Sequence, residues 1–235
     1  MGLVSAEEWE VLQLSVKIAS WSVAGSLPFA ALVALILARL DFRGKSAFDA
    51  LIHLPLVLPP VVIGYFLLLL LGRRGPVGAF LEEYFGIVFA FRWTGAAVAC
   101  AVMGFPLMVR AIRLSLEAVD ERLEAAARTL GASRLWVLAS ITLPLTMPGI
   151  ITGMLLSFAR SLGEFGATIT FVSNIPGETR TLPLAIYAFT QVPGGDVQAM
   201  RLSIISVVLS VAALLVSEVM ARRATLRLKG RDAQG

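Results

Sequence analysis

The chain has 235 residues, of which 57% are hydrophobic and 15% are charged, and its formal net charge is +4. A soluble globular domain is about 45–50% apolar and about 25% charged, so this composition excludes an ordinary soluble domain and indicates a membrane protein. The single cysteine, Cys100, and the single histidine, His53, exclude internal disulfides, multi-cysteine metal sites and two-histidine zinc motifs. With no hydrolase motif in the sequence, we expect no metal, no cofactor and no catalytic residue.

Five stretches are long and apolar enough to cross a bilayer, for which a helix needs about 20 residues. They cover residues 9–40, 48–71, 93–116, 145–165 and 202–220. Each must be helical, because lipid offers no hydrogen-bond partner to the backbone. The expected fold class is therefore all-α: a polytopic helical membrane protein with about five transmembrane helices, in a single domain over residues 1–235. A sixth stretch at 181–191 is short and carries Pro183, so we interpret it as re-entrant or interfacial.

The loop after the first stretch contains Gly44-Lys45-Ser46, which resembles the end of a phosphate-binding loop. That motif needs a glycine five residues before Gly44, and this position is Arg39. We therefore expect that the chain does not bind ATP itself.

The second stretch contains Pro55, Pro59 and Pro60. Prolines remove backbone donors and kink a helix, which is tolerated in a membrane only where protein or a water-filled cavity covers the freed carbonyls. Two interpretations of these prolines remain: a kink that serves only helix packing, or a stretch that lines a pore.

The positions of Lys and Arg predict the orientation, because such residues gather in cytoplasmic loops. Three groups fall on one side if there are five spans: Arg39, Arg43 and Lys45; Arg122, Arg128 and Arg134; and Arg222, Arg223, Arg227, Lys229 and Arg231. That side is then the cytoplasm, with the N-terminus outside and the C-terminus in the cytoplasm. Arg73 and Arg74 go against this pattern on the other side.

The segment over residues 119–144, which we call the elbow, has its own pattern. Leu123, Ala126, Ala127 and Leu130 follow helical spacing and predict a short amphipathic helix over 120–130. Gly131 is placed to end it in a left-handed turn, and Ser133 to cap a second helix that begins at Arg134. We expect a rigid knob on the cytoplasmic face, and an ordinary inter-helix loop is the alternative.

The fourth stretch carries small residues four apart, namely Gly149, Gly153, Ser157 and Ser161. Residues at this spacing share one helix face and let another backbone come close. We favour helix packing as their role, and a polar face beside a pathway is the alternative.

Arg160 and Glu164 lie one turn apart in the same stretch. Each charge costs at least about 2.5–3.5 kcal/mol inside a membrane on insertion scales. They are either a self-paired couple or functional.

Several segments resemble a known family. Glu124-Ala-Ala-Ala-Arg-Thr-Leu-Gly131, followed by Ile141, Leu143 and Pro144, resembles the signature loop of ABC importer permeases: Glu-Ala-Ala, three residues, Gly, nine residues, Ile-X-Leu-Pro. In this register Ala125 stands where the family has Glu, and Glu124 comes one position earlier. The runs 53–60, 105–113 and 158–180 resemble the molybdate permease branch, and parts of them are shared with sulfate permeases.

The resemblance implies a type I ABC importer permease in the bacterial inner membrane. It implies that two copies of this subunit form the pathway, that two cytoplasmic ABC ATPase subunits bind the elbows, and that a periplasmic molybdate-binding protein delivers the substrate. Sulfate or tungstate is the alternative substrate. No basic patch with interleaved aromatic residues indicates nucleic acid as a partner.

Two sets of site residues follow from this expectation. The ATPase-coupling residues are Glu124, Ala125, Ala126, Gly131, Ile141, Leu143 and Pro144. Strong fixed cations would hold a tetrahedral dianion too tightly, whereas hydroxyls and helix ends bind an anion more weakly. The pathway candidates are Ser157, Ser161, Glu164, Thr168 and Thr170.

A membrane-embedded enzyme and a channel are the competing classes. An enzyme needs ionisable groups clustered at mid-bilayer depth, and the available ones are scattered over three stretches: Lys17, His53, Arg160 and Glu164. A channel has no need of a rigid cytoplasmic elbow.

Overall fold

The structure, a computed structural model, describes residues 5–232, and every regular element in that range is a helix. Four helical stretches are long and apolar enough to cross a membrane: α1 (Ala6–Arg39), α5 (Trp93–Glu117), the stretch Arg134–Leu162, and Asp196–Ala213 of α11 (Asp196–Asp232). A broken helix pair adds a fifth if it counts as one span. The all-α polytopic class with about five spans is confirmed.

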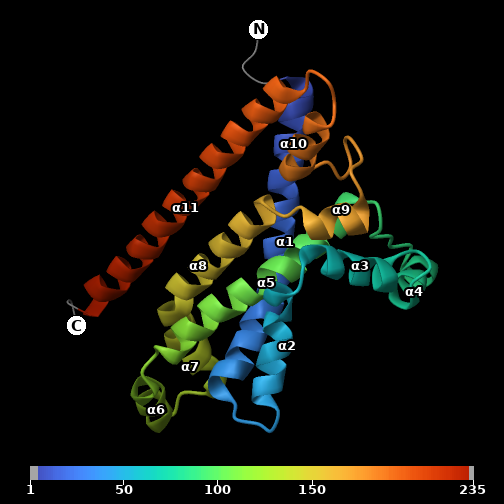
Figure 1. The fold of residues 1–235 in the computed structure, drawn as a ribbon. Helices are drawn as coiled ribbons and strands as arrows, with labels where there is room; N and C mark the ends of the chain where they lie inside the picture. The colour runs from blue at the N-terminus through green and yellow to red at the C-terminus, as the bar shows by residue number, and fades with distance from the viewer. Residues whose placement is uncertain (1–4, 233–235) are drawn as a thin grey trace.

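The other elements include the three parts of the stretch Arg134–Leu162. They are α2 (Lys45–Val57), α3 (Pro60–Leu71), α4 (Pro76–Phe85), α6 (Glu121–Thr129), α7 (Arg134–Val137), a π-helical turn (Leu138–Thr142), α8 (Leu143–Leu162), α9 (Gly166–Val172) and α10 (Leu182–Thr190). In Figure 1, α1, α5 and α8 pack against one another and α11 lies along α8. The loop between α1 and α2, the elbow and the last turns of α11 lie toward the same, lower end.

The second stretch departs from the expected single helix over 48–71. The structure breaks it between α2 and α3, and the two halves are bent by 110°. Leu58 and Pro59 are extended between them, because a residue before proline is pushed out of the helical region and Pro59 and Pro60 lack an N–H group. Pro55, in contrast, lies inside α2 without ending it. The prediction of one kinked helix over 48–71 was therefore wrong. In Figure 1, α3 and α4 extend sideways from the bundle.

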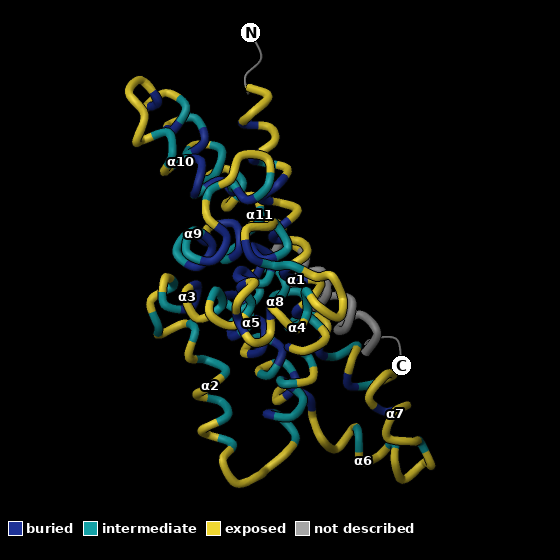
Figure 2. The backbone as a smooth tube through the Cα atoms, turned by 90° about the vertical axis from the view of Figure 1, so that its right-hand side faces the viewer, coloured by how far each residue is buried: buried dark blue, intermediate teal, exposed yellow. Residues whose placement is uncertain are grey.

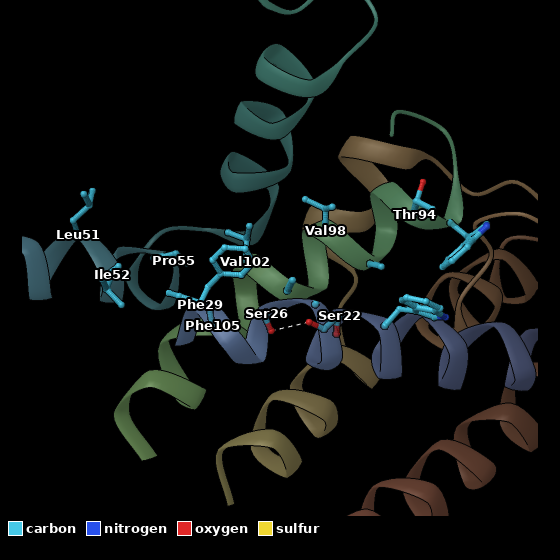
Figure 3. A pocket seen from close by; sticks show the side chains of 15 residues that line it. Ser22, Ser26, Phe29, Leu51, Ile52, Pro55, Thr94, Val98, Val102 and Phe105 are labelled. Carbon is cyan, nitrogen blue, oxygen red and sulfur yellow. Dashed lines mark hydrogen bonds between the residues drawn. The ribbon is translucent and has the colours of Figure 1, made fainter. Parts of the chain in front are cut away.

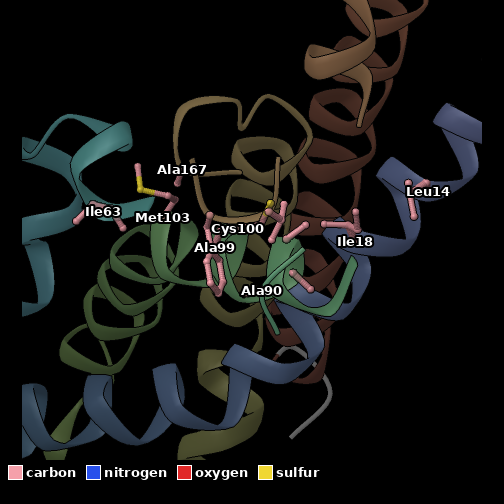
Figure 4. Packing of buried hydrophobic residues seen from close by; sticks show 12 residues of the cluster. Leu14, Ile18, Ile63, Ala90, Ala99, Cys100, Met103 and Ala167 are labelled. Atoms are coloured by element: carbon pink, nitrogen blue, oxygen red, sulfur yellow. The ribbon is translucent and has the colours of Figure 1, made fainter. Parts of the chain in front are cut away.

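The sideways helix α3 is held by α9. An added Cβ at Gly64 of α3 would lie 2.9 Å from the Cα of Ala167, so the two backbones are in close contact. Ile63 and Ala167 join a buried cluster with Ala99 and Met103 of α5, as Figure 4 shows. The start of α3 is thus packed against protein, whereas Leu56 and Val57, just before the break, are exposed.

The short stretch at 181–191 is confirmed as too short to span. It forms the nine-residue α10, which begins with Pro183 in its first turn and packs on α11 and α1. Leu182, Leu184 and Ala185 are buried there. The backbone N–H of Leu182 donates to Ser15 Oγ of α1 at 2.8 Å, which ties α10 to the upper part of α1.

The small-residue face of α8 packs against α5 of the same chain. An added Cβ at Gly149 would lie 2.8 Å from the carbonyl oxygen of Ala111, and one at Gly153 would lie 3.2 Å from the Cα of Met108. Ser157 packs on Gly104 of α5, where an added Cβ would lie 3.3 Å from the Cα of Ser157. The packing interpretation is therefore confirmed, and this face is occupied within one chain rather than free for a second copy.

Gly149→Ala is expected to push α8 away from α5 and to destabilise the protein by about 1–3 kcal/mol, the usual cost of overpacking. The measurement is the thermal unfolding midpoint of the detergent-solubilised protein. Gly25→Ala in α1 is the matched control, because a Cβ there meets nothing within 4 Å. Equal midpoints for the two variants would contradict the close α5–α8 contact.

Candidate functional site: the elbow between α5 and α8

The first half of the elbow is the predicted short helix. Asp120 caps α6, because its carboxylate accepts a hydrogen bond from the Arg122 N–H at 2.9 Å. After α6 the chain turns at Gly131, whose φ of +87° is the left-handed conformation that glycine adopts without strain. Ser133 then caps α7 by accepting from the Trp136 N–H at 3.2 Å. The helix–Gly–helix geometry expected from the sequence is confirmed.

The second half of the elbow continues directly into a membrane span. Residues Arg134–Leu162 form one helical stretch, in which α7 passes through the π-helical turn into α8. Pro144 has no N–H to donate, and the backbone instead widens so that the Leu143 N–H reaches the Leu138 carbonyl. No loop therefore separates α7 from α8.

Figure 2 draws most of the tube at α6 and α7 in yellow, the colour of exposed residues. Large apolar side chains are among them. Leu130 is 89% exposed, Leu135 79% and Trp136 55%. A cavity of about 610 Å³ lies beside them, with walls that include Ile141 and Gly131. An exposed apolar patch next to a cavity is typical of a protein–protein contact.

The predicted coupling residues divide between this surface and the interior. Ala125 and Ala126 are exposed on α6, and Ile141 lines the cavity. Leu143 is exposed and Pro144 half-buried at the start of α8. Their role in coupling stays a prediction.

Glu124 points the other way, into the chain. Its Oε1 atom accepts from the Arg39 guanidinium at 2.6 Å and from the Thr142 hydroxyl at 2.7 Å. Arg39 is the last residue of α1, and Thr142 ends the π-helical turn. The sequence analysis missed these partners, because nothing in it shows that residues 39 and 124 meet.

Four of the five pathway candidates are buried inside the chain. They are Ser157, Ser161, Glu164 and Thr168, whereas Thr170 is half-buried. The Thr168 and Thr170 hydroxyls donate to carbonyls of their own segment, those of Phe165 and Gly166. Exposing these groups to a passing ion requires a rearrangement of α8 and α9, so their pathway role stays a prediction.

Arg160 and Glu164 are paired with each other. The Arg160 Nη1 and Glu164 Oε2 atoms are 2.7 Å apart, and Glu164 is buried while Arg160 is partly exposed. Glu164 Oε1 also accepts from the Ala167 N–H at 2.8 Å, in the first turn of α9. The pair neutralises the buried carboxylate and holds the corner between α8 and α9, which fits the self-paired interpretation.

An apolar groove of about 640 Å³ lies between α1, α2 and α5, as Figure 3 shows. Phe29, Leu51, Pro55 and Val102 are among the residues that line it. The Ser26 hydroxyl beside it donates to the Ser22 carbonyl at 2.7 Å and is not free for a ligand. These walls suit an apolar segment or a lipid chain rather than an oxyanion.

The part of the chain that the structure describes holds no group of three or more metal-ligating side chains. The ionisable residues Lys17, His53 and Arg160 lie on three different helices, α1, α2 and α8. Lys17 places its ammonium 3.8 Å from the ring centre of Trp93.

Comparison with known proteins identifies relatives over most of the chain. Residues 26–226 match the family described as "Binding-protein-dependent transport system inner membrane component". A molybdenum transport system permease protein of Escherichia coli K12 is 60% identical, over 94% of this chain and 96% of that protein. A sulfate transport system permease protein of Salmonella typhimurium is 38% identical, over 79% of this chain and 70% of that protein.

Among solved structures, a bacterial ABC transporter involved in the import of the acidic polysaccharide alginate has a chain of the same fold. The TM-score is 0.73 at 18% sequence identity, and the match covers 93% of this chain and 80% of that one.

Proposed function

Because the chain belongs to the family of binding-protein-dependent transport system inner membrane components, we propose that it is the permease subunit that an ABC importer uses to take up molybdate. The observation that carries the mechanism is the exposed elbow whose second helix continues unbroken into α8. A force on the elbow therefore reaches the membrane region directly. A channel or a structural subunit has no use for such a lever.

The energy comes from partner ATPases in this proposal. Two cytoplasmic ATPase subunits dock on the elbows of two copies of the chain, and their closure pushes the elbows. The apolar side chains Leu130, Leu135 and Trp136 provide the contact, and their exposure in the isolated chain supports this. A periplasmic binding protein presents the oxyanion at the opposite end.

The proposed orientation follows from the positive charges. The loop between α1 and α2, the elbow and the end of α11 share one end of the molecule, and these are the regions richest in Lys and Arg. We place that end in the cytoplasm and the N-terminal end of α1 outside.

Molybdate is favoured over sulfate and tungstate by similarity. The relative named for molybdenum transport is 60% identical, and the one named for sulfate transport is 38% identical. All three ions are tetrahedral dianions of related size. The substrate preference is therefore measured by letting the ions compete for uptake.

Reconstitution tests the function. The chain is purified with its ATPase, placed in liposomes and supplied with the binding protein. ATP-dependent uptake of labelled molybdate is expected, with excess sulfate competing weakly. The purified chain alone is expected to hydrolyse no ATP. ATP turnover by the pure chain, or ATP-independent uptake, would refute the assignment.

Leu130→Glu is expected to lower the amount of ATPase that co-purifies with the chain at least tenfold. The substitution puts a charge into a contact that we propose to be apolar, where an unpaired charge is costly. Val192→Glu, an exposed residue between α10 and α11, is the matched control and should leave the yield unchanged. Undiminished ATPase recovery with Leu130→Glu would contradict docking at the elbow.

Gly131→Pro is expected to abolish transport while membrane insertion persists. Proline fixes φ near −65°, which is incompatible with the +87° at this turn. Gly86→Pro is the matched control: Gly86 also has a positive φ, open space around it and one backbone N–H bond to lose, but it lies outside the elbow. Wild-type uptake by Gly131→Pro would refute the role of the elbow.

A further inference from the structure

The helix that receives the force in the proposed mechanism is attached weakly by packing. α6 buries none of its nine residues. The turn that joins it to α7 is equally open, because no atom lies within 4 Å of a Cβ added at Gly131. Burial of apolar side chains therefore contributes little to holding α6 against the neighbouring helices. Polar contacts must fix its position.

Two carboxylates of α6, those of Glu121 and Glu124, contact Arg39, and Glu124 is the less exposed of the two. Glu124 bonds Arg39 at the end of α1 and Thr142 at the end of the π-helical turn, at 2.6 and 2.7 Å. The side chains of Arg39 and Glu124 are only 19% and 15% exposed, so solvent screens this pair little. We call Glu124, Arg39 and Thr142 the Glu124 brace. It joins α6 to the end of α1, 85 residues away in the sequence, and to the π-helical turn, 18 residues away.

The register of the chain explains why this carboxylate faces inward. Successive residues of an α-helix are rotated by about 100°, so a glutamate moved by one position points to a different side. Ala125, which stands where the related loops have glutamate, is exposed on α6. Glu124, one position earlier, is turned toward α1. Its carboxylate is used within the chain and is not presented to a docked partner.

We propose that Glu124 is a positioning residue that makes α6, the end of α1 and the π-helical turn move as one body. This inference rests on the proposed function of the chain as an ABC importer permease. The covalent routes from α6 lead back through residues 118–120 to α5 and forward through the open Gly131 turn to α8. The Glu124 brace adds a third, charged route, so that displacement of α6 also drives α1 directly.

The test measures coupling rather than activity alone. In reconstituted transporters, Glu124→Ala and Thr142→Val are expected to keep ATPase assembly and ATP hydrolysis near the wild-type level. Molybdate taken up per ATP hydrolysed is expected to fall at least fivefold. Glu121→Ala is the matched control, because Glu121 lies on the same helix and also contacts Arg39, at 3.2 Å, but is 82% exposed.

A charge exchange separates positioning from simple folding. R39E alone is expected to behave like Glu124→Ala, and R39E/E124R to restore uptake per ATP to within twofold of the wild type. If Glu124→Ala does not assemble with the ATPase, R39E/E124R still tests the proposal. Restored assembly with restored coupling in this double variant supports the brace. Failure to restore coupling refutes the brace. Wild-type coupling in Glu124→Ala also refutes it. Absence of molybdate uptake by the wild-type complex would instead overturn the proposed function.

Discussion

The cost of an unpaired backbone group in hydrocarbon governs this molecule. Each spanning segment is a helix, and the start of α3, which follows the irregular backbone, packs on α9 and α5. The close contacts that allow such packing use small residues, such as Gly64 on Ala167 and Gly149 beside Ala111.

In the proposed mechanism, the same constraint allows the elbow to transmit force. The chain leaves the membrane after α5, turns once in water, and returns through Arg134–Leu162 as a single helical stretch. Pro144 would break an ordinary helix there, and the π-helical turn absorbs its missing donor. Because α8 packs on α5 over a face of small residues, we propose that motion of the elbow reaches the middle of the bundle.

Much of the site was predictable from local sequence. Gly131 and Ser133 have conformational roles that act within a few residues, so their turn and cap could be recognised directly. The partners of Glu124 could not be recognised from the sequence, because Arg39 is 85 positions away. In the sequence, Arg39 is only one of several positive charges near a loop. The break at Pro59 was also misjudged: the prolines indicated a kink, and the size of the bend depends on the space that α9 provides for α3.

The sequence by itself determined the bilayer setting, the helical class and the existence of the elbow, because these depend on hydropathy, charge distribution and short-range backbone preferences. Only the tertiary structure decided that the small-residue face of α8 is filled by α5, that Ser157 and Thr168 are buried, and that Glu124 faces α1. Those outcomes depend on which distant surfaces meet and at what rotation. A single helix pattern does not specify them, since the same face can pack on a neighbour in the chain or on another copy.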